Sequence, residues 1–170
     1  MEFRDVIERR YSVRKYSRRD IAEDVLTKVL GAFVLAPTAA NRQAMGLVVV
    51  HTQGREDDLR RIYSADWFAS QPPIVLAACG TAGAWTRRTD GKSYQDVDVA
   101  IAMDHVILAA TDEGLGTCWI AAFDPQAARE VLALPDGVVP IALSPLGYPA
   151  DDAGPKRRKT LEDLVHWQRW

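Results

Sequence analysis

The sequence predicts an α+β fold in which helices flank a β-sheet, and three observations lead to this class. Four apolar runs of strand length alternate with segments of helical periodicity along the 170 residues. The chain opens with two helical segments in succession. A long helix that is apolar almost all round occupies its middle, and neither feature fits a simple doubly wound sheet. The length fits a single domain, 1–170, with a C-terminal arm at about 151–170.

The first third of the chain predicts two helices and a loop. Residues 3–10 form a short first helix. We expect Asp20 to cap the second helix, because Glu23 stands three residues on, as in a capping box. This helix should stop just before Pro37, since the residue before a proline avoids helical geometry. The loop at 36–45, rich in small and amide side chains, is called the amide loop below.

Two buried strands follow, at 46–52 and 72–79, because both runs are apolar and the first is rich in valine. Between them, residues 54–65 predict a surface helix of mixed charge. From 80 to 95 the chain loses periodicity. A loop of that length inside a compact domain is usually functional or mobile.

Residues 96–115 form the longest predicted helix. Because it is apolar almost all round, we expect it to be buried in a core or in a subunit interface. Residues 117–123 predict a third strand and 139–147 a fourth. Asp124 followed by Pro125 is a strong helix start, with the acid as cap and proline as first residue.

The charge distribution is uneven. The formal net charge is −2, which argues weakly against a dedicated nucleic-acid binder. Yet residues 9–19 hold six Lys or Arg and no acid, and 156–159 holds four in a row. A nucleic acid, a membrane, a partner protein and a phosphate-bearing ligand all suit such segments, and so does a solvated helix end. A compact cluster that includes Ser12 favours a single phosphate over a long polyanion.

Several function classes lack support. The three histidines are widely separated, so no metal site is expected, and the glycine-rich motifs of ATP and NAD cradles are missing. No apolar stretch approaches the ~20 residues of a membrane span, and the charged N-terminus does not resemble a signal peptide. We therefore expect a cytoplasmic protein. Cys79 and Cys118 are expected to be buried free thiols, although one disulfide stays open.

Four stretches together resemble the nitroreductase family of flavin-dependent oxidoreductases, in its short-chain branch. They are RRYSVRKY (9–16), APTAANRQAM (36–45), DVAIAMDHVILAATDEGLGTCWIAAFD (98–124) and PLGYPADDAGPKRRKTLEDLV (145–165). They stand in the family's order and cover most of the chain. The resemblance implies a nitroreductase-like fold with a central mixed, mainly antiparallel sheet. It also implies an intertwined homodimer that exchanges C-terminal arms.

The resemblance further implies non-covalent FMN binding, with NAD(P)H as the reductant. The first motif would bind the phosphate and the pyrimidine side of the flavin, and the amide loop would contact the ring. The third motif would present backbone N–H groups to flavin N5 and O4. The last motif would bind the phosphate a second time. The implied cofactor-binding residues are Arg10, Tyr11, Ser12, Arg14, Pro37, Thr38, Asn41, Gln43, Ala121, Ala122, Lys156 and Arg158. Ala44-Met45 replaces the family's Pro-Trp, and the Ala121–Ala122 pair lacks the glycine that relatives often have.

The implied activity is an oxidoreductase with ping-pong turnover. Hydride would pass from NAD(P)H through flavin N5 to an electron-poor small molecule, nitroaromatic or quinone-like, without a catalytic acid or base. Trp67, Phe68 and Trp85 are candidates for the acceptor pocket, and a core role is equally open for each. Each homodimer would hold two FMN sites at the subunit interface, built from both chains.

Three alternatives remain open at this stage. A relative with a specialised flavin reaction, such as dehalogenation or heterocycle oxidation, would keep the flavin and change the chemistry. A flavin-binding protein without turnover would keep only the cofactor. A nucleic-acid module would use the two basic segments, with Tyr11 and Tyr16 stacking on bases.

Overall fold

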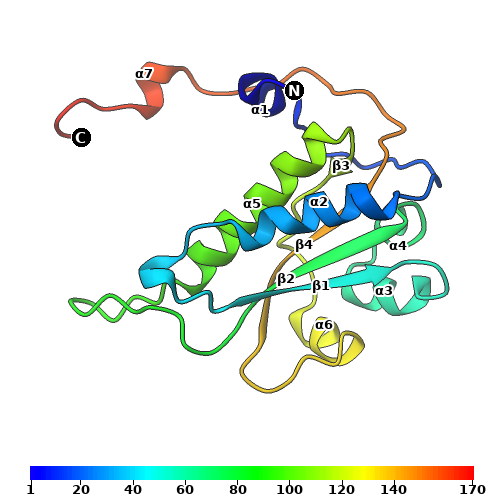
Figure 1. Cartoon of the computed structure of the whole chain (residues 1–170), viewed down its shortest axis with the longest axis horizontal. Coiled ribbons are helices and arrows are strands. Elements are labelled where there is room, and N and C mark those ends of the chain that lie inside the picture. Colours follow the sequence, from blue (N-terminus) through cyan, green and yellow to red (C-terminus); the bar gives the residue numbers. More distant parts are fainter.

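The computed structural model describes residues 1–170 as a four-stranded sheet with helices on both faces (Figure 1). The strands are β1 (Met45–His51), β2 (Ile74–Gly80), β3 (Gly116–Thr117) and β4 (Val139–Gly147), in the order β1-β2-β4-β3. Every pair in the sheet is antiparallel. The mixed character expected from the sequence is limited to one isolated parallel bridge, between Ser12 and Thr117.

The central strand β2 divides the core in two, because successive side chains of a strand point to opposite faces. All seven of its residues are buried. Leu76 and its alternate neighbours pack against α2 (Glu23–Val34) and α5 (Gln95–Asp112). Val75 and Ala77 pack against the opposite layer, which consists of α3 (Glu56–Ile62), α4 (Asp66–Ser70) and α6 (Pro125–Val131).

Helix α5 is the longest helix, as predicted, but only one of its faces is covered. The buried face carries Val99, Ala102, Met103, Val106, Ile107 and Ala110. On the opposite side Val97 is exposed, and Ile101 and Leu108 are half-buried. The helix therefore belongs to the core and also leaves apolar side chains open on its other side, in a stripe that Asp104 and His105 interrupt.

The predicted second helix starts later than its sequence suggests. Helix α2 begins at Glu23 and has no side-chain cap, so the cap predicted at Asp20 is wrong. The reason is tertiary, because the chain before it is extended and pairs with the end of β4. Ser17 N–H donates to Tyr148 O at 2.9 Å and Tyr16 bridges Pro149, so the backbone at residues 16–17 is extended just ahead of Asp20.

The predicted third strand, 117–123, is mostly absent. Strand β3 covers two residues, and pairing with β4 returns only at Ile120, which bridges Leu143. Residue 118 would face Pro145 in this register, and proline has no N–H to donate to the ladder. Cys118 N–H donates instead to Ser144 Oγ at 3.2 Å.

Other predictions hold. Asp124 Oδ1 accepts from the N–H groups of Gln126 and Ala127 at the start of α6. Cys79 and Cys118 are both free and buried, as expected.

The short helix α4 was not predicted. None of the helices combines the length and apolar character that crossing a membrane requires.

The two chain ends lie on the same side of the molecule. Helix α1 (Phe3–Arg9) sits by the C-terminal end of α5, where the Met1 amino group pairs with Asp112 at 2.7 Å. The C-terminal segment runs back past α1 in an extended form, forms the short helix α7 (Leu161–Leu164) and continues without helix to Trp170 (Figure 1). A capping box formed by Thr160 and Asp163 opens α7.

Candidate functional site

The two basic segments from opposite ends of the chain meet in one cavity of about 400 Å³. Five of its nine lining residues are Arg or Lys, and none is acidic. The lining residues are Arg10, Tyr11, Ser12, Arg14, Gly154, Pro155, Lys156, Arg157 and Arg158. We call this the basic cavity. Such a concentration of cations favours the approach of an anion, within a protein of net negative charge.

Residues 10–14 reach the cavity because they run alongside β3. Val13 N–H donates to Thr117 O at 2.9 Å, and the Val13 side chain is fully buried. Because extended backbone alternates its faces, Ser12 and Arg14 lie on the other side of the segment from Val13, where they line the cavity. Gly116 permits this approach, since a Cβ there would lie 2.5 Å from Val13 Cγ2.

The Cys118 thiol lies beneath these residues. Burial raises the pKa of this thiol. The positive charge of Arg14, a hydrogen bond with Ser12, and the positive charge of Arg10 act in the opposite direction. The net shift is upward, so the thiol stays neutral near the cavity at neutral pH.

Lys156 anchors the C-terminal segment to α1. Its Nζ donates to Ile7 O at 3.1 Å and to Glu8 O. These carbonyls belong to the last turn of α1, where the helix dipole favours a cation. Burial, Arg10 and Arg158 lower the pKa of Lys156. Two of its three N–H donors are used within the chain, so one remains for a ligand.

Tyr11 also contacts the C-terminal segment. Its hydroxyl donates to Asp151 O at 2.6 Å and to Asp151 Oδ1 at 3.2 Å. Burial and the Asp151 carboxylate raise the pKa of Tyr11 to about 12. No local pattern pointed to the contact of Tyr11 with Asp151, because 140 residues separate the pair.

The amide loop is a separate, tightly held structure that contains the one-turn helix η1 (Ala39–Asn41). Ala40, Asn41 and Gln43 have φ between 51° and 52°, a left-handed conformation that residues with a Cβ rarely adopt. Thr38 Oγ1 accepts from Gln43 N–H at 3.1 Å, and the Asn41 and Gln43 side chains bond each other. Strained backbone of this kind clusters at ligand sites.

Asp98 of α5 supports the amide loop. Its Oδ1 accepts from Ala39 N–H at 2.9 Å. The residue is 2% exposed, and its Oδ2 has no hydrogen-bond partner within the chain. Burying a polar oxygen without a hydrogen-bond partner costs free energy, so the bond from Ala39 N–H offsets only part of the cost of burying Asp98. In the sequence, Asp98 is one residue of the predicted apolar helix 96–115, and no motif sets it apart.

The amide loop and the basic cavity lie at opposite ends of α5. Asp98 holds the loop at one end, while Thr111 shares a hollow with Arg10 and Tyr11 at the other. Thirteen residues of helix separate them, which is about 20 Å at about 1.5 Å per residue. One chain therefore does not bring the two predicted cofactor segments together.

Ala121 and Ala122 lie in the segment between β3 and α6. Both are exposed, and neither N–H donates a hydrogen bond within the chain. These two N–H groups are available to a ligand.

The three aromatic pocket candidates are not brought together. Phe68 is fully buried in the core beneath the sheet, which corrects its assignment to an acceptor pocket. Trp67 is half-buried against the same core and meets Tyr63 edge-on at 6.1 Å. Trp85 lies in the 80–95 loop beyond the other end of β2 and packs edge-on against Tyr94 at 5.1 Å.

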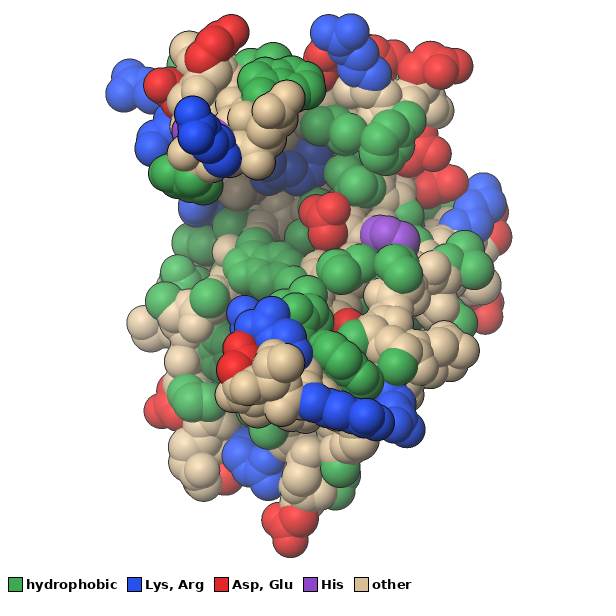
Figure 2. Space-filling view, turned by 90° about the vertical axis from the view of Figure 1, so that its left-hand side faces the viewer, with side chains coloured by type: hydrophobic (Ala, Val, Ile, Leu, Met, Phe, Trp, Pro, Cys, Tyr) green, Lys and Arg blue, Asp and Glu red, His purple; other side chains and the backbone are tan.

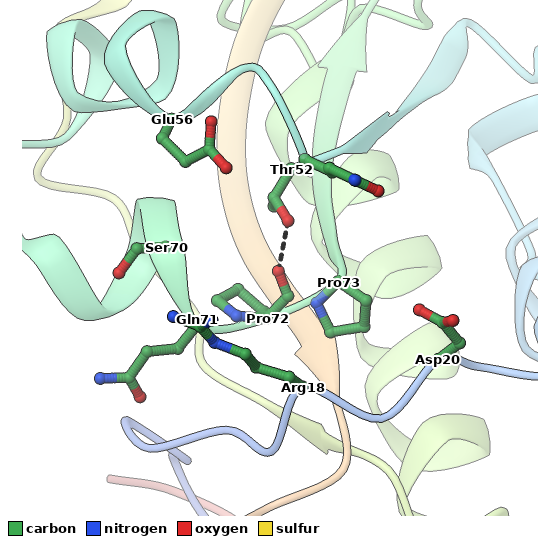
Figure 3. A pocket seen from close by; sticks show the side chains of 9 residues that line it. Arg18, Asp20, Thr52, Glu56, Ser70, Gln71, Pro72 and Pro73 are labelled. Carbon is green, nitrogen blue, oxygen red and sulfur yellow. Dashed lines mark hydrogen bonds between the residues drawn. The ribbon is translucent and has the colours of Figure 1, made fainter.

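A second hollow, of about 340 Å³, differs from the basic cavity in charge (Figure 3). Arg18 is the one cation in its lining, and Asp20 and Glu56 are both acidic. Thr52 Oγ1 is already bonded to Pro72 O at 2.6 Å. This hollow does not suit an anionic ligand. No three His, Cys, Asp or Glu side chains lie close enough together to hold a metal ion.

Comparison with known proteins assigns the chain to a family. The sequence model of the Nitroreductase family matches residues 7–81 and 65–148. The chain belongs to the nitroreductase family. A solved nitroreductase family protein from Clostridium difficile 630 superimposes with a TM-score of 0.89 at 33% identity, over the full length of both chains. The predicted nitroreductase fold is thus confirmed.

Two curated relatives of this nitroreductase-family chain have named activities. The FMN reductase [NAD(P)H] of Bacillus subtilis is 26% identical, and the match covers 94% of this chain and 70% of the relative. The NADH dehydrogenase of Thermus thermophilus is also 26% identical, with 94% of this chain and 93% of the relative covered.

Proposed function

We propose that this nitroreductase-family chain is an FMN-dependent oxidoreductase that takes its reducing equivalents from NAD(P)H and reduces an electron-poor small molecule, such as a nitroaromatic or a quinone. The basic cavity is the observation that carries this proposal. It is assembled from both ends of the chain, and its chemistry suits the phosphate of FMN. The relatives named as an FMN reductase and an NADH dehydrogenase support the same cofactor pair.

The residues present fit the cofactor. Guanidinium groups donate two parallel hydrogen bonds to a phosphate, and Arg10, Arg14 and Arg158 all line the cavity. Ser12 adds a hydroxyl, and no lining carboxylate opposes an anion. FMN, once bound, supplies the hydride chemistry that amino-acid side chains lack. Arg14 would place positive charge beside the flavin and so favour its reduced form.

The complete site needs a second copy of the chain. The amide loop, with Pro37, Thr38, Asn41 and Gln43, lies about 20 Å from the basic cavity of its own chain. In a homodimer, the loop of one chain would meet the cavity of the other and contact the flavin ring. Ala121 and Ala122 would then offer their free N–H groups to the ring edge.

The surface supports such a dimer. Trp167 is 84% exposed and Trp170 is 99% exposed, although large aromatic side chains are usually covered. Figure 2 shows apolar side chains gathered over the middle of one face, below the overhanging C-terminal segment. The open stripe of α5 adds further apolar surface. We propose that the outer part of the C-terminal arm (151–170), the residues beyond Arg158, crosses to the partner and covers part of this surface, while residues 151–158 stay on their own chain.

The testing experiment is a visible absorption spectrum of the purified protein, without oxygen, before and after NADH or NADPH. A flavin spectrum that bleaches with either nucleotide supports the proposal. A flavin that stays oxidised favours a binding protein without turnover. Bleaching without reoxidation by nitroaromatics or quinones favours a specialised flavin reaction. A colourless protein that FMN does not reconstitute contradicts the proposal.

A matched pair of variants locates the cofactor. Arg158→Ala should lower the FMN content, because it removes a guanidinium from the basic cavity. Arg18→Ala removes the same charge from the second hollow and should leave the FMN content unchanged. Equal loss in both variants would indicate an effect of overall charge.

A further inference from the structure

The C-terminal segment that supplies half of the basic cavity has little to hold it in place. Every residue from 152 to 170 is exposed, so no buried side chain anchors it. The body of the protein ends where Ala150 N–H donates to Lys15 O at 2.8 Å. Beyond that point, we call residues 151–158 the strap. Its position depends on the few bonds that join it to residues 7–14.

Two ties bracket the strap. Lys156 forms one, on the carbonyls at the end of α1. Asp151 forms the other, through its backbone oxygen and Oδ1 to the Tyr11 hydroxyl. Its Oδ2 also accepts from Arg14 N–H, in a longer contact of 3.4 Å. These ties set the strap against the segment that carries Arg10, Ser12 and Arg14, so that the cavity has two cationic walls.

Asp151 carries a negative charge beside a cavity that we expect to bind an anion, so its charge and its hydrogen bonds act on anion binding in opposite directions. A carboxylate beside an anion site repels the anion, so as a charge alone Asp151 would weaken phosphate binding. Its bonding to Tyr11 and Arg14 acts in the opposite direction, because it fixes the wall that carries Arg158. The two roles predict opposite effects of removing the side chain.

We propose that Asp151 is a positioning residue that holds the strap against residues 10–14 and thereby gives the site its preference for a phosphate-bearing ligand. The identity of that ligand as FMN rests on the proposed function. The tie itself does not, because it is formed within the chain.

The decisive comparison uses Asp151→Ala, Tyr11→Phe and the control Asp152→Ala. Asp152 is the next residue, is exposed and carries the same charge. Dissociation constants for FMN and riboflavin, which lacks only the phosphate, are measured on flavin-free protein by flavin fluorescence. We expect Tyr11→Phe, which removes every bond of the phenol to Asp151, to weaken FMN binding about tenfold. Asp151→Ala keeps the backbone acceptor and loses the Oδ1 and Oδ2 contacts, so it should weaken FMN binding about three- to tenfold, with riboflavin binding unchanged in both variants. Asp152→Ala should leave FMN binding equal or slightly tighter.

The outcomes separate this inference from the proposed function. If Asp151→Ala binds FMN as tightly as Asp152→Ala or more tightly, Asp151 acts only as a charge and the inference is overturned. If wild-type protein shows no preference for FMN over riboflavin, the proposed function fails instead. Inorganic phosphate, followed by calorimetry, then replaces FMN: weaker binding to Asp151→Ala supports the tie, and equal or tighter binding overturns it.

A second readout needs no ligand. The Tyr11 phenol, whose pKa is raised to about 12, is titrated by ultraviolet absorbance and isolated by subtracting the Tyr11→Phe spectrum. Asp151→Ala should lower this pKa towards the ordinary value near 10, and Asp152→Ala should change it less. An unchanged Tyr11 titration in Asp151→Ala would show that the Asp151 side chain does not bond Tyr11 in solution, which would overturn the inference.

Discussion

The close approach of residues 10–14 to β3 gives the sharpest prediction. An alanine at position 116 would place its Cβ 2.5 Å from Val13 Cγ2 and 2.9 Å from Val13 Cβ. Carbon atoms pack at about 3.5–4.0 Å, so the Val13 segment must retreat by about 1 Å. The hydrogen bond from Val13 N–H to Thr117 O, now 2.9 Å, would then stretch beyond a normal length.

The expected cost follows from this crowding. Overpacking in a well-filled core costs about 1–3 kcal/mol. In a chain of this size that lowers the melting temperature by roughly 2–12 °C. Because Ser12 and Arg14 flank Val13, their donors shift by a similar distance, and FMN binding should weaken about tenfold or more.

The assay combines thermal unfolding with FMN titration of Gly116→Ala and of a control, Gly46→Ala. A Cβ at position 46 meets no atom within 4 Å, so the control should be neutral or slightly stabilised. Val13→Ala removes the nearest clashing atom but keeps the Cβ, so the double variant should lose less stability than the sum of its parts. A Gly116→Ala protein as stable as Gly46→Ala, with unchanged FMN binding, would refute the reasoning.

Three further predictions concern other parts of the molecule. Arg14→Ala should release FMN more readily and lower the flavin reduction potential with the fold intact; unchanged FMN retention would remove Arg14 from the site. Asp98→Ala should destabilise the amide loop and increase its cleavage by proteases, because the hydrogen bond worth about 1–3 kcal/mol is lost, while Asp98→Asn keeps an acceptor and should lose less. Burial raises the pKa of Cys79 to about 11 from 9.0 and also raises the pKa of Tyr16. The unfolded chain therefore releases these protons first, and the free energy of unfolding should fall as pH rises above about 9, which denaturant titrations from pH 8 to 11 would detect.

Local patterns determined most of the secondary structure. The apolar runs at 46–52, 72–79 and 139–147 appear as β1, β2 and β4, with bounds that differ by two residues or fewer. Asp124 caps α6 as expected, because a cap depends on residues within one turn. The third strand failed because its pairing depends on Pro145, which lies far along the chain. The start of α2 failed for a similar reason, since extended pairing with Tyr148 overrides the local cap.

The sequence by itself also determined the chemical character of each functional segment. These properties follow from local composition, so they can be identified before the fold is known. They are the Lys and Arg residues at 9–19 and 156–159, the amides at 36–45 and the apolar helix. The resemblance to the nitroreductase family rests on the same segments, and the family assignment confirmed it.

Only the tertiary structure decided which segments meet. It joined the two basic segments in one cavity and held the amide loop at the far end of α5. It also paired Tyr11 with Asp151 across 140 residues and Lys156 with Ile7 across 149. Such contacts depend on the path that the packed sheet and helices impose on the whole chain. No local pattern records that path, because the hydrogen bond between two distant residues is formed only after the core has brought them together.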